Sequence, residues 1–171
     1  MPRRILMVGR FQPFHNGHIL VIRKMLEAFP SVILGIGSAQ YSHTPQNPFT
    51  AGERVEMAVE SLRAERIRDF FVVPMEDINE HGRWVAHVES LVPRFTAVAS
   101  NNPLTMRLFQ ESGYEVLTTP LYDRRRYSGT VIRKRILSGK PWKQLVPPAV
   151  STIIEGIGGV ERLRQLTGKD E

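Results

Sequence analysis

Cysteine is absent from the 171-residue chain, and no apolar run is long enough to cross a membrane. The missing cysteines exclude disulfide bonds and thiolate chemistry, so a bound metal would need oxygen or nitrogen ligands. The apolar stretch after the basic start Met1-Pro2-Arg3-Arg4 is too short for a secretory signal. We therefore expect a cytoplasmic protein with no membrane partner.

The common nucleotide-binding and hydrolytic motifs are also missing. No segment has the glycine spacing of a Walker loop, and Gly35-Ile36-Gly37 is not followed by the third glycine of a dinucleotide fingerprint. No Ser-His-Asp arrangement is evident either. Any phosphate site in this chain must therefore be built from other groups.

Positive charge is abundant, but it is confined to one part of the chain. The formal net charge is +6 and the isoelectric point is about 10.1. Eight basic residues lie between Tyr122 and Lys143 with the single acid Asp123, which leaves 15 basic and 16 acidic residues elsewhere. Such a local cluster fits a polyphosphate ligand at least as well as a nucleic acid. A catalytic phosphate site and a non-catalytic nucleotide-sensing or RNA-binding module both stay open at this point.

Apolar segments of strand length alternate with amphipathic segments of helical length. Strands are expected at 4–8, 32–37, 69–74, 95–99 and 115–118, and helices at 18–29, 51–65, 84–92, 104–111, 131–137, 147–157 and 160–166. The alternation is typical of a mostly parallel sheet with helices on both faces. We predict an α/β fold, a Rossmann-like doubly wound parallel sheet of about five strands with a helical C-terminal segment.

The length predicts one domain. With 171 residues and 42% hydrophobic content, the chain can bury one core. We expect a single domain of residues 1–171, in which 1–118 form the core and 119–171 supply an Arg-rich loop and C-terminal helices.

The stretch from Gly9 to His18 joins the first expected strand to the first helix and is the best candidate for chemistry. His18 falls in the first helical turn, where free N–H groups and the helix dipole attract anions. His15 and Arg10 add donors and positive charge. Such a set stabilises a transferring phosphoryl or nucleotidyl group without a covalent nucleophile. A structural zinc pair has less support, because no third and fourth ligands are in register with the two histidines.

Three polar loops and the Arg-rich segment follow expected strands. The carboxyl ends of parallel strands meet at one edge of a sheet, where ligands bind. The segments that should converge there are 38–47, 75–83, 100–103 and 120–127. We expect one ligand to lie across that edge.

Two motifs resemble the signatures of the nucleotidylyltransferase superfamily. His15-Asn16-Gly17-His18 is similar to its HxGH motif, and the segment from Ser128 to Arg133 is similar to its SxTxxR motif at a helix start. Longer strings at 9–18, 37–40, 47–54 and 127–130 resemble the archaeal type of nicotinamide mononucleotide (NMN) adenylyltransferase. The string Pro-Phe-Thr-Ala-Gly-Glu-Arg and Trp84 argue against a phosphopantetheine adenylyltransferase or a cytidylyltransferase, which share HxGH.

The resemblance implies adenylyl transfer from ATP to NMN, giving NAD and pyrophosphate, with Mg²⁺ accompanying the triphosphate. The catalytic residues it implies are His15, His18 and Arg10. The ATP-binding residues it implies are Gly9, Phe11, Arg124, Tyr127, Ser128, Thr130 and Arg133. The NMN-binding residues it implies are Ser38, Gln40, Asp77, Ile78, Trp84 and Asn102. It further implies no protein ligand to a metal, no nucleic-acid partner and a homo-oligomer, a hexamer in relatives.

Several of these residues also have ordinary structural interpretations. A tryptophan at a helix start is by base rate a packing residue, although for Trp84 the resemblance favours a platform for nicotinamide. Asp77 fits a loop cap about as well as a substrate contact, and only one or two of Arg124–Arg126 are expected to reach phosphate. Gln46 stands where some relatives have a basic residue, and Arg54 or the Arg124–Arg126 run is a candidate replacement.

Overall fold

A five-stranded parallel sheet forms the centre of the structure, a computed structural model that describes residues 2–168. The strands are β1 (Arg4–Gly9), β2 (Ser31–Ile36), β3 (Phe70–Pro74), β4 (Ala97–Ala99) and β5 (Glu115–Leu117). They lie in the order β3-β2-β1-β4-β5, and every neighbouring pair is parallel. The predicted α/β fold with a parallel sheet is confirmed.

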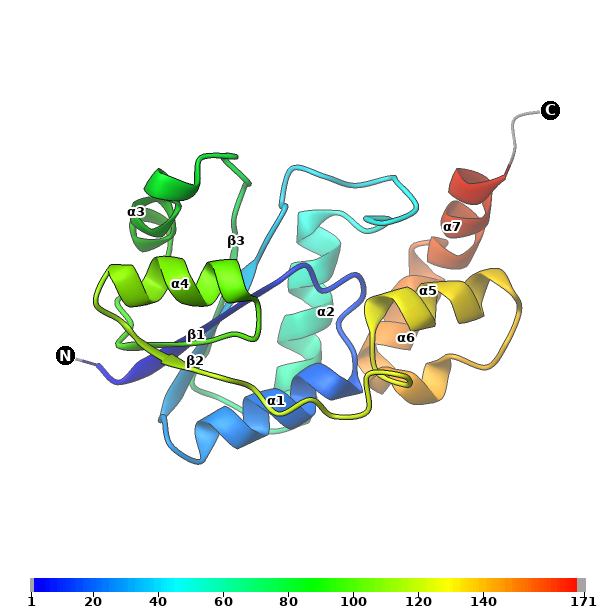
Figure 1. The fold of residues 1–171 in the computed structure, drawn as a ribbon. Coiled ribbons are helices and arrows are strands. Elements are labelled where there is room, and N and C mark those ends of the chain that lie inside the picture. Colours follow the sequence, from blue (N-terminus) through cyan, green and yellow to red (C-terminus); the bar gives the residue numbers. More distant parts are fainter. Residues whose placement is uncertain (1, 169–171) are drawn as a thin grey trace.

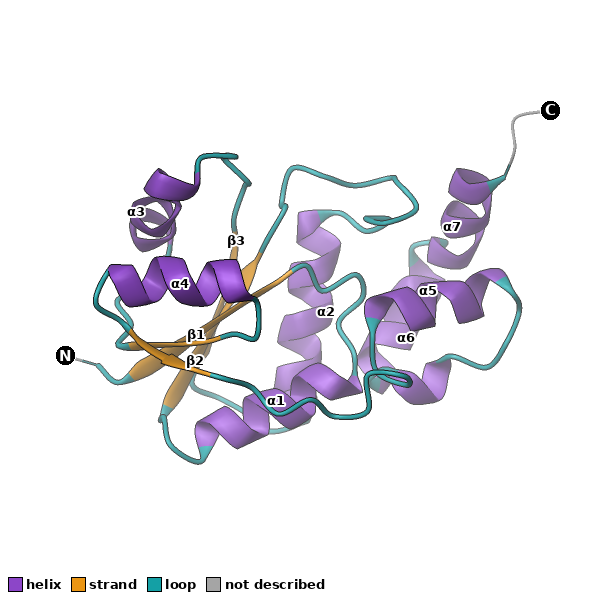
Figure 2. Ribbon diagram, in the orientation of Figure 1, coloured by secondary structure: helices purple, strands orange, loops and turns teal. Residues whose placement is uncertain are grey.

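Helices cover both faces of this sheet. They are α1 (Asn16–Leu26), α2 (Ala51–Ala64), α3 (His81–Leu91), α4 (Pro103–Glu111), α5 (Gly129–Leu137), α6 (Pro148–Gly156) and α7 (Gly159–Thr167), with a short 3₁₀ turn, η1 (Lys143–Leu145). Figures 1 and 2 show α5, α6 and α7 gathered on the side toward which β1 ends. The carboxyl edge of the sheet therefore faces the C-terminal helices.

The central strands are apolar throughout because they contribute to two cores. Ile5 and Met7 of β1 belong to a core with α1, α2 and the C-terminal helices. Leu6, which points to the opposite face, belongs to a second core with α3 and α4. Ile132 of α5 and Ile154 of α6 lie in the first core, so the last third of the chain packs onto the sheet domain.

Several element boundaries differ from expectation, among them the end of α1, which lies at Leu26 rather than Phe29. Helix α3 begins at His81 rather than Trp84. The apolar periodicity does not reveal its first turn, because His81 and Gly82 are exposed and not apolar. Strand β4 begins at Ala97 rather than Phe95, whose ring instead stacks on Tyr114 with centroids 4.6 Å apart. Met1 and residues 169–171 of the expected domain lie outside the described residues. No helix within 2–168 has both the length and the apolar character of a bilayer span.

Candidate active site

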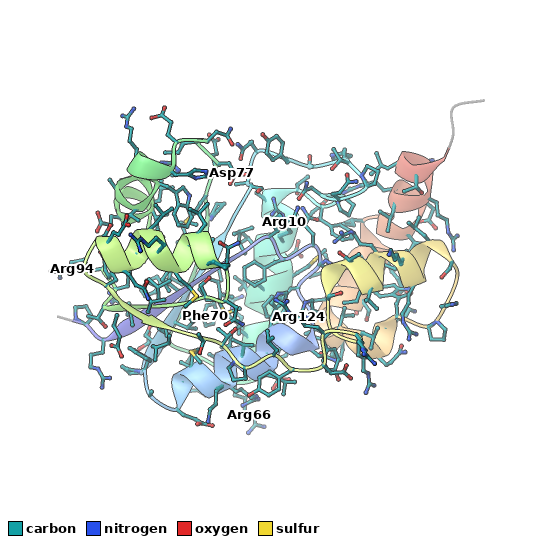
Figure 3. All side chains as sticks on the ribbon, viewed as in Figure 1. Arg10, Arg66, Phe70, Asp77, Arg94 and Arg124 are labelled. Atoms are coloured by element: carbon teal, nitrogen blue, oxygen red, sulfur yellow. The ribbon has the colours of Figure 1, made fainter. Side chains whose placement is uncertain are left out.

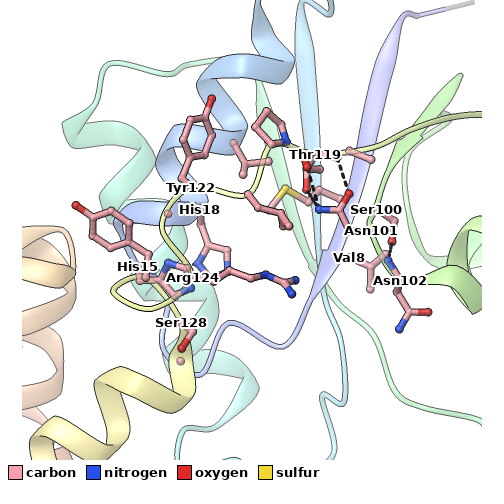
Figure 4. A pocket seen from close by; sticks show the side chains of 18 residues that line it. Val8, His15, His18, Ser100, Asn101, Asn102, Thr119, Tyr122, Arg124 and Ser128 are labelled. Carbon is pink, nitrogen blue, oxygen red and sulfur yellow. Dashed lines mark hydrogen bonds between the residues drawn. The ribbon is translucent and has the colours of Figure 1, made fainter.

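A cavity of about 570 Å³ opens at the carboxyl edge of the sheet. Met7 and Val8 of β1 line it together with Ala99 and Ser100 at the end of the neighbouring strand β4. The strand order reverses between β1 and β4, and open α/β sheets bind ligands at such a point. Figure 4 shows this cavity, whose further lining residues include His15, His18, Asn102, Arg124, Tyr127 and Ser128.

His15 and His18 stack on each other at the start of α1. Their ring centroids are 3.6 Å apart and their planes differ by 21°. The backbone N–H of His15 donates to Nδ1 of His18 at 3.0 Å, so a neutral His18 carries its proton on Nε2. Within residues 2–168, the buried Nδ1 of His15 has no hydrogen-bond partner. The pair thus offers an N–H donor and an unsatisfied ring nitrogen beside the cavity.

Burial keeps both imidazoles neutral near pH 7. It lowers the pKa of His15, which is 8% exposed, to about 4. Burial also lowers the pKa of His18 well below its usual value, and neighbouring His15 lowers it further. A phosphate group bound beside them would favour the protonated form and raise these pKa values again. The two rings can therefore gain positive charge where negative charge develops.

Phe11 and Phe14 support the ring of His18. Their centroids lie 4.6 and 5.2 Å from that of His18. The Phe11 side chain is only 2% exposed, so a contact between Phe11 and ATP would have to come from its backbone. That backbone has a φ of 51°, a left-handed conformation that is rare for a bulky residue. The loop after β1 is thus held in an uncommon shape that carries the histidines to the cavity.

The second motif lies directly against the first. Ser128 caps α5 by accepting from the backbone N–H of Val131 at 3.1 Å. Nη1 of Arg133 donates to the carbonyl of Gln12 at 2.7 Å. A Cβ on Gly129 would lie 2.9 Å from the same oxygen, so only glycine allows this approach. The structure therefore brings the starts of α1 and α5 together at one cavity.

Arginines supply the positive charge of the site. Arg124 lines the cavity and extends toward its middle in Figure 4, whereas Arg125 and Arg126 are exposed outside it. Arg10 is exposed at the same edge of the sheet (Figure 3), and together with burial its charge lowers the pKa of Arg133. Of the run Arg124–Arg126, one residue reaches the cavity.

A second cavity of about 220 Å³ adjoins the first. Asp77, Ile78, Trp84 and Asn102 all line it, and Asn102 lines the larger cavity as well. Trp84 is half-buried and packs edge-on against Phe109, with centroids 5.5 Å apart. Trp84 therefore both packs against α4 and lines the second cavity.

Ser38 and Gln40 line neither cavity but hold Asp77. Ser38 Oγ donates to Oδ2 of Asp77 at 2.6 Å. The side-chain amide of Gln40 donates to the carbonyl of Asp77 at 2.9 Å and accepts from its backbone N–H at 3.0 Å. Ser38 and Gln40 follow β2, whereas Asp77 follows β3. Their hydrogen bonds therefore join the two loops.

Two residues of this edge have roles that their sequence context did not indicate. Asn101 in the cavity wall exchanges hydrogen bonds with the backbone of Thr119 at 2.9 Å in both directions. Arg54 is 0% exposed and, in the described part of the chain, donates only to backbone carbonyls, so it is not available to replace a basic residue at position 46. Within residues 2–168, no group of three or more His, Asp or Glu side chains could hold a metal ion.

Several known proteins resemble this chain along nearly its whole length. Residues 6–135 match the cytidylyltransferase-like family. The nicotinamide-nucleotide adenylyltransferase of Picrophilus torridus is 51% identical over 168 residues, which are 98% of this chain and 99% of that protein. The nicotinamide-nucleotide adenylyltransferase of Thermoplasma acidophilum is 48% identical over 169 residues, 99% of this chain and 94% of that protein.

A solved structure shares the fold at low sequence identity. It is the crystal structure of a bifunctional NMN adenylyltransferase/ADP ribose pyrophosphatase from Francisella tularensis complexed with AMP and a manganese ion, which matches with a TM-score of 0.77 and 21% identity. The match covers 97% of this chain and 52% of that one, so this chain spans about half the length of that protein. From the sequence relatives, the chain belongs to the cytidylyltransferase-like family and, within it, to the nicotinamide-nucleotide adenylyltransferases.

Proposed function

We propose that the protein transfers the adenylyl group of ATP to NMN, forming NAD and pyrophosphate. A 5′-phosphate oxygen of NMN attacks the α-phosphorus of ATP, and the bond from that phosphorus to the bridging oxygen of pyrophosphate breaks. The observation that carries this proposal is the pair of adjoining cavities, one beside two stacked histidines and the other beside a tryptophan. No protein nucleophile is needed, because the attacking group belongs to NMN.

The catalytic work is assigned to His15, His18 and Arg10. The Nε2–H of His18 donates to the α-phosphate, whose negative charge spreads as the new bond forms. His15 and Arg10 contribute a further donor and a positive charge. All three act by positioning and charge stabilisation, and the two imidazoles among them are neutral before substrate binds.

The ATP phosphates are assigned to the start of α5 and the arginines beside it. Ser128, Thr130 and Arg133 hold the β- and γ-phosphates with the free N–H groups of the helix start. Arg124 contributes from the cavity wall. The adenosine lies near Gly9 and Tyr127, and Phe11 contributes through its backbone because its side chain is buried.

The nicotinamide ring is assigned to the second cavity. A flat, partly cationic ring is stabilised on the face of an indole, here Trp84. Asp77 and Ile78 line the same cavity, and Asn102 borders both substrates. Because the Oδ1 of Asn102 caps α4, its Nδ2 is the group left for a substrate phosphate or hydroxyl. The NMN-binding roles of Ser38 and Gln40 are indirect in this proposal, through Asp77.

Mg²⁺ is proposed to enter with the triphosphate. The Francisella protein was crystallised with AMP and a manganese ion, and divalent ions neutralise phosphate charge in such transfers. The residues lining the larger cavity include no Asp or Glu, which fits an ion carried by the phosphates. A cytoplasmic location and a homo-oligomer, a hexamer in relatives, are proposed from the family resemblance, and light scattering of the purified protein measures the assembly.

Incubation of the protein with ATP, NMN and Mg²⁺ tests the proposal. We expect NAD and pyrophosphate in equal amounts, resolved by chromatography and a coupled phosphate assay. A protein that releases no pyrophosphate but binds RNA with a steep salt dependence would support the non-catalytic alternative instead.

A further inference from the structure

Arg54 of α2 is the largest fully buried side chain of the described residues, and it lies beneath the loops of the candidate site. Its guanidinium makes hydrogen bonds only to backbone carbonyl oxygens. Within residues 2–168, no carboxylate forms a hydrogen bond or ion pair with it. The carbonyls are those of Arg10 (2.8 Å), Gly37 (2.8 Å), Ser38 (3.1 Å), Thr50 (3.2 Å) and Tyr41 (3.5 Å).

Two of these carbonyls precede the strained turns that end β1 and β2. Phe11, which follows Arg10, has a φ of 51°, and Ser38, which follows Gly37, has a φ of 50°. Bulky or β-substituted residues adopt such values only where surrounding contacts impose them. Nη1 of Arg54 donates to both preceding carbonyls, and thus joins the two turns through one atom.

Each turn leads to a different part of the site. The turn at Phe11 leads to His15 and His18 beside the larger cavity. The turn at Ser38 leads to the hydrogen bonds that hold Asp77 in the second cavity. Arg54 therefore connects the loop on the phosphate side of the site with the loop on the nicotinamide side.

We propose that Arg54 is a positioning residue that fixes the loop after β1 relative to the loop after β2, so that both substrates are held for in-line attack. This inference rests on the proposed function. The rigid, planar fork of arginine can donate to several carbonyls at once, whereas a lysine ammonium has three donors at a single point. Charge alone is therefore not sufficient for the role.

Arg54→Lys tests the proposal, and Arg162→Lys is its matched control. Arg162 forms an ion pair with Glu53, the neighbour of Arg54 on α2, and lies away from both cavities. Both variants keep the charge and lose the guanidinium fork. We expect Arg54→Lys to lower kcat about a hundredfold and to raise the KM for NMN about tenfold, because small misplacements of reacting groups have effects of this size. Arg162→Lys is expected to stay within about twofold in both constants.

Backbone amide hydrogen exchange gives a readout that does not depend on the reaction. In Arg54→Lys, peptides covering residues 9–18 and 36–47 are expected to exchange about tenfold faster than in Arg162→Lys, because the bonds that fix both turns are lost. A folded Arg54→Lys with unchanged exchange in both loops overturns the proposal. So does an Arg54→Lys variant whose kcat and KM equal those of an active wild type. A wild type that makes no NAD contradicts the proposed function alone, and the exchange data then decide the role of Arg54.

Discussion

At the scale of single residues, the proposed phosphate site contains two imidazoles that are neutral near pH 7. Burial against each other and against two phenylalanine rings disfavours the charged form of His15 and His18. The hydrogen bond from the His15 backbone selects the tautomer of His18. The structure therefore holds a neutral His18 with its N–H at Nε2, and in the proposed function a bound phosphate would raise the pKa values of both imidazoles.

The low pKa of His15 predicts a loss of stability in acid. Between pH 6.5 and about 4 the unfolded chain binds a proton that the folded chain does not, so falling pH favours unfolding. This one residue is expected to remove about 3 kcal/mol from the free energy of unfolding across that range. Urea unfolding of wild type and His15→Asn at several pH values measures the difference, and equal pH slopes would contradict the assigned pKa.

At the scale of elements, the site exists because the first turns of α1 and α5 meet. Gly17 and Gly129 allow this contact. A Cβ on Gly17 would lie 2.9 Å from Cε1 of His15 and 2.9 Å from Cβ of Tyr127. The second cavity is formed in the same way, between α4 and the segment entering α3. The shapes of the two cavities thus depend on how closely the ends of these helices approach each other.

Gly129→Ala is expected to separate α5 from the loop after β1. The added methyl would meet the backbone oxygen of Gln12, which cannot move aside as a flexible side chain can. We expect kcat/KM for ATP to fall about tenfold or more, because the phosphate-binding helix start is displaced. Gly156→Ala on α6, where nothing lies within 4 Å of the new methyl, serves as control and is expected to leave steady-state kinetics unchanged.

Trp84→Ala is expected to raise the KM for NMN about tenfold, and the KM for ATP much less, because the indole face for the nicotinamide ring is removed. Trp84 also packs on Phe109, so Trp84→Phe is the companion variant that keeps an aromatic ring at this position. Steady-state kinetics with each substrate varied in turn separate the two constants. Equal effects on both would contradict nicotinamide stacking.

The sequence predicts elements better than it predicts contacts. Central strands such as β2 are continuous apolar runs, and Thr50 and Ser128 are recognisable caps, so the sheet and most helices follow from local patterns. The burial of Arg54 does not, because an arginine on an amphipathic helix normally faces solvent. The hydrogen bonds from Ser38 and Gln40 to Asp77 do not follow from local patterns either, because they depend on the register of β2 beside β3. The burial of Arg54 and the hydrogen bonds to Asp77 depend on loops that meet only in the folded chain.

At the scale of the whole molecule, the excess charge and the cavities share one edge of the sheet. Arg124 brings part of the basic segment into the larger cavity, whereas the rest of the chain has nearly balanced charge. The isoelectric point of about 10.1 therefore reflects a local cluster of eight basic residues, from which Arg124 enters the larger cavity.

We also propose that the chain is one domain, because one core joins the sheet to the C-terminal helices. Ile5 of β1, Met57 of α2 and Ile154 of α6 belong to this core. A single cooperative unfolding transition is expected, with circular dichroism and tryptophan fluorescence coincident. Separate transitions would show that the C-terminal helices unfold on their own.

The rate of NAD formation by His18→Ala, compared with wild type and His43→Ala, tests the central claim most directly. His43 is an exposed loop residue whose ring shares a hydrogen bond with Ser42 and lines neither cavity, so its loss is expected to leave the rate unchanged. Loss of the positioned donor at His18 is expected to lower kcat about a hundredfold or more while circular dichroism stays that of the folded protein. A folded His18→Ala enzyme that makes NAD at the wild-type rate would contradict the account.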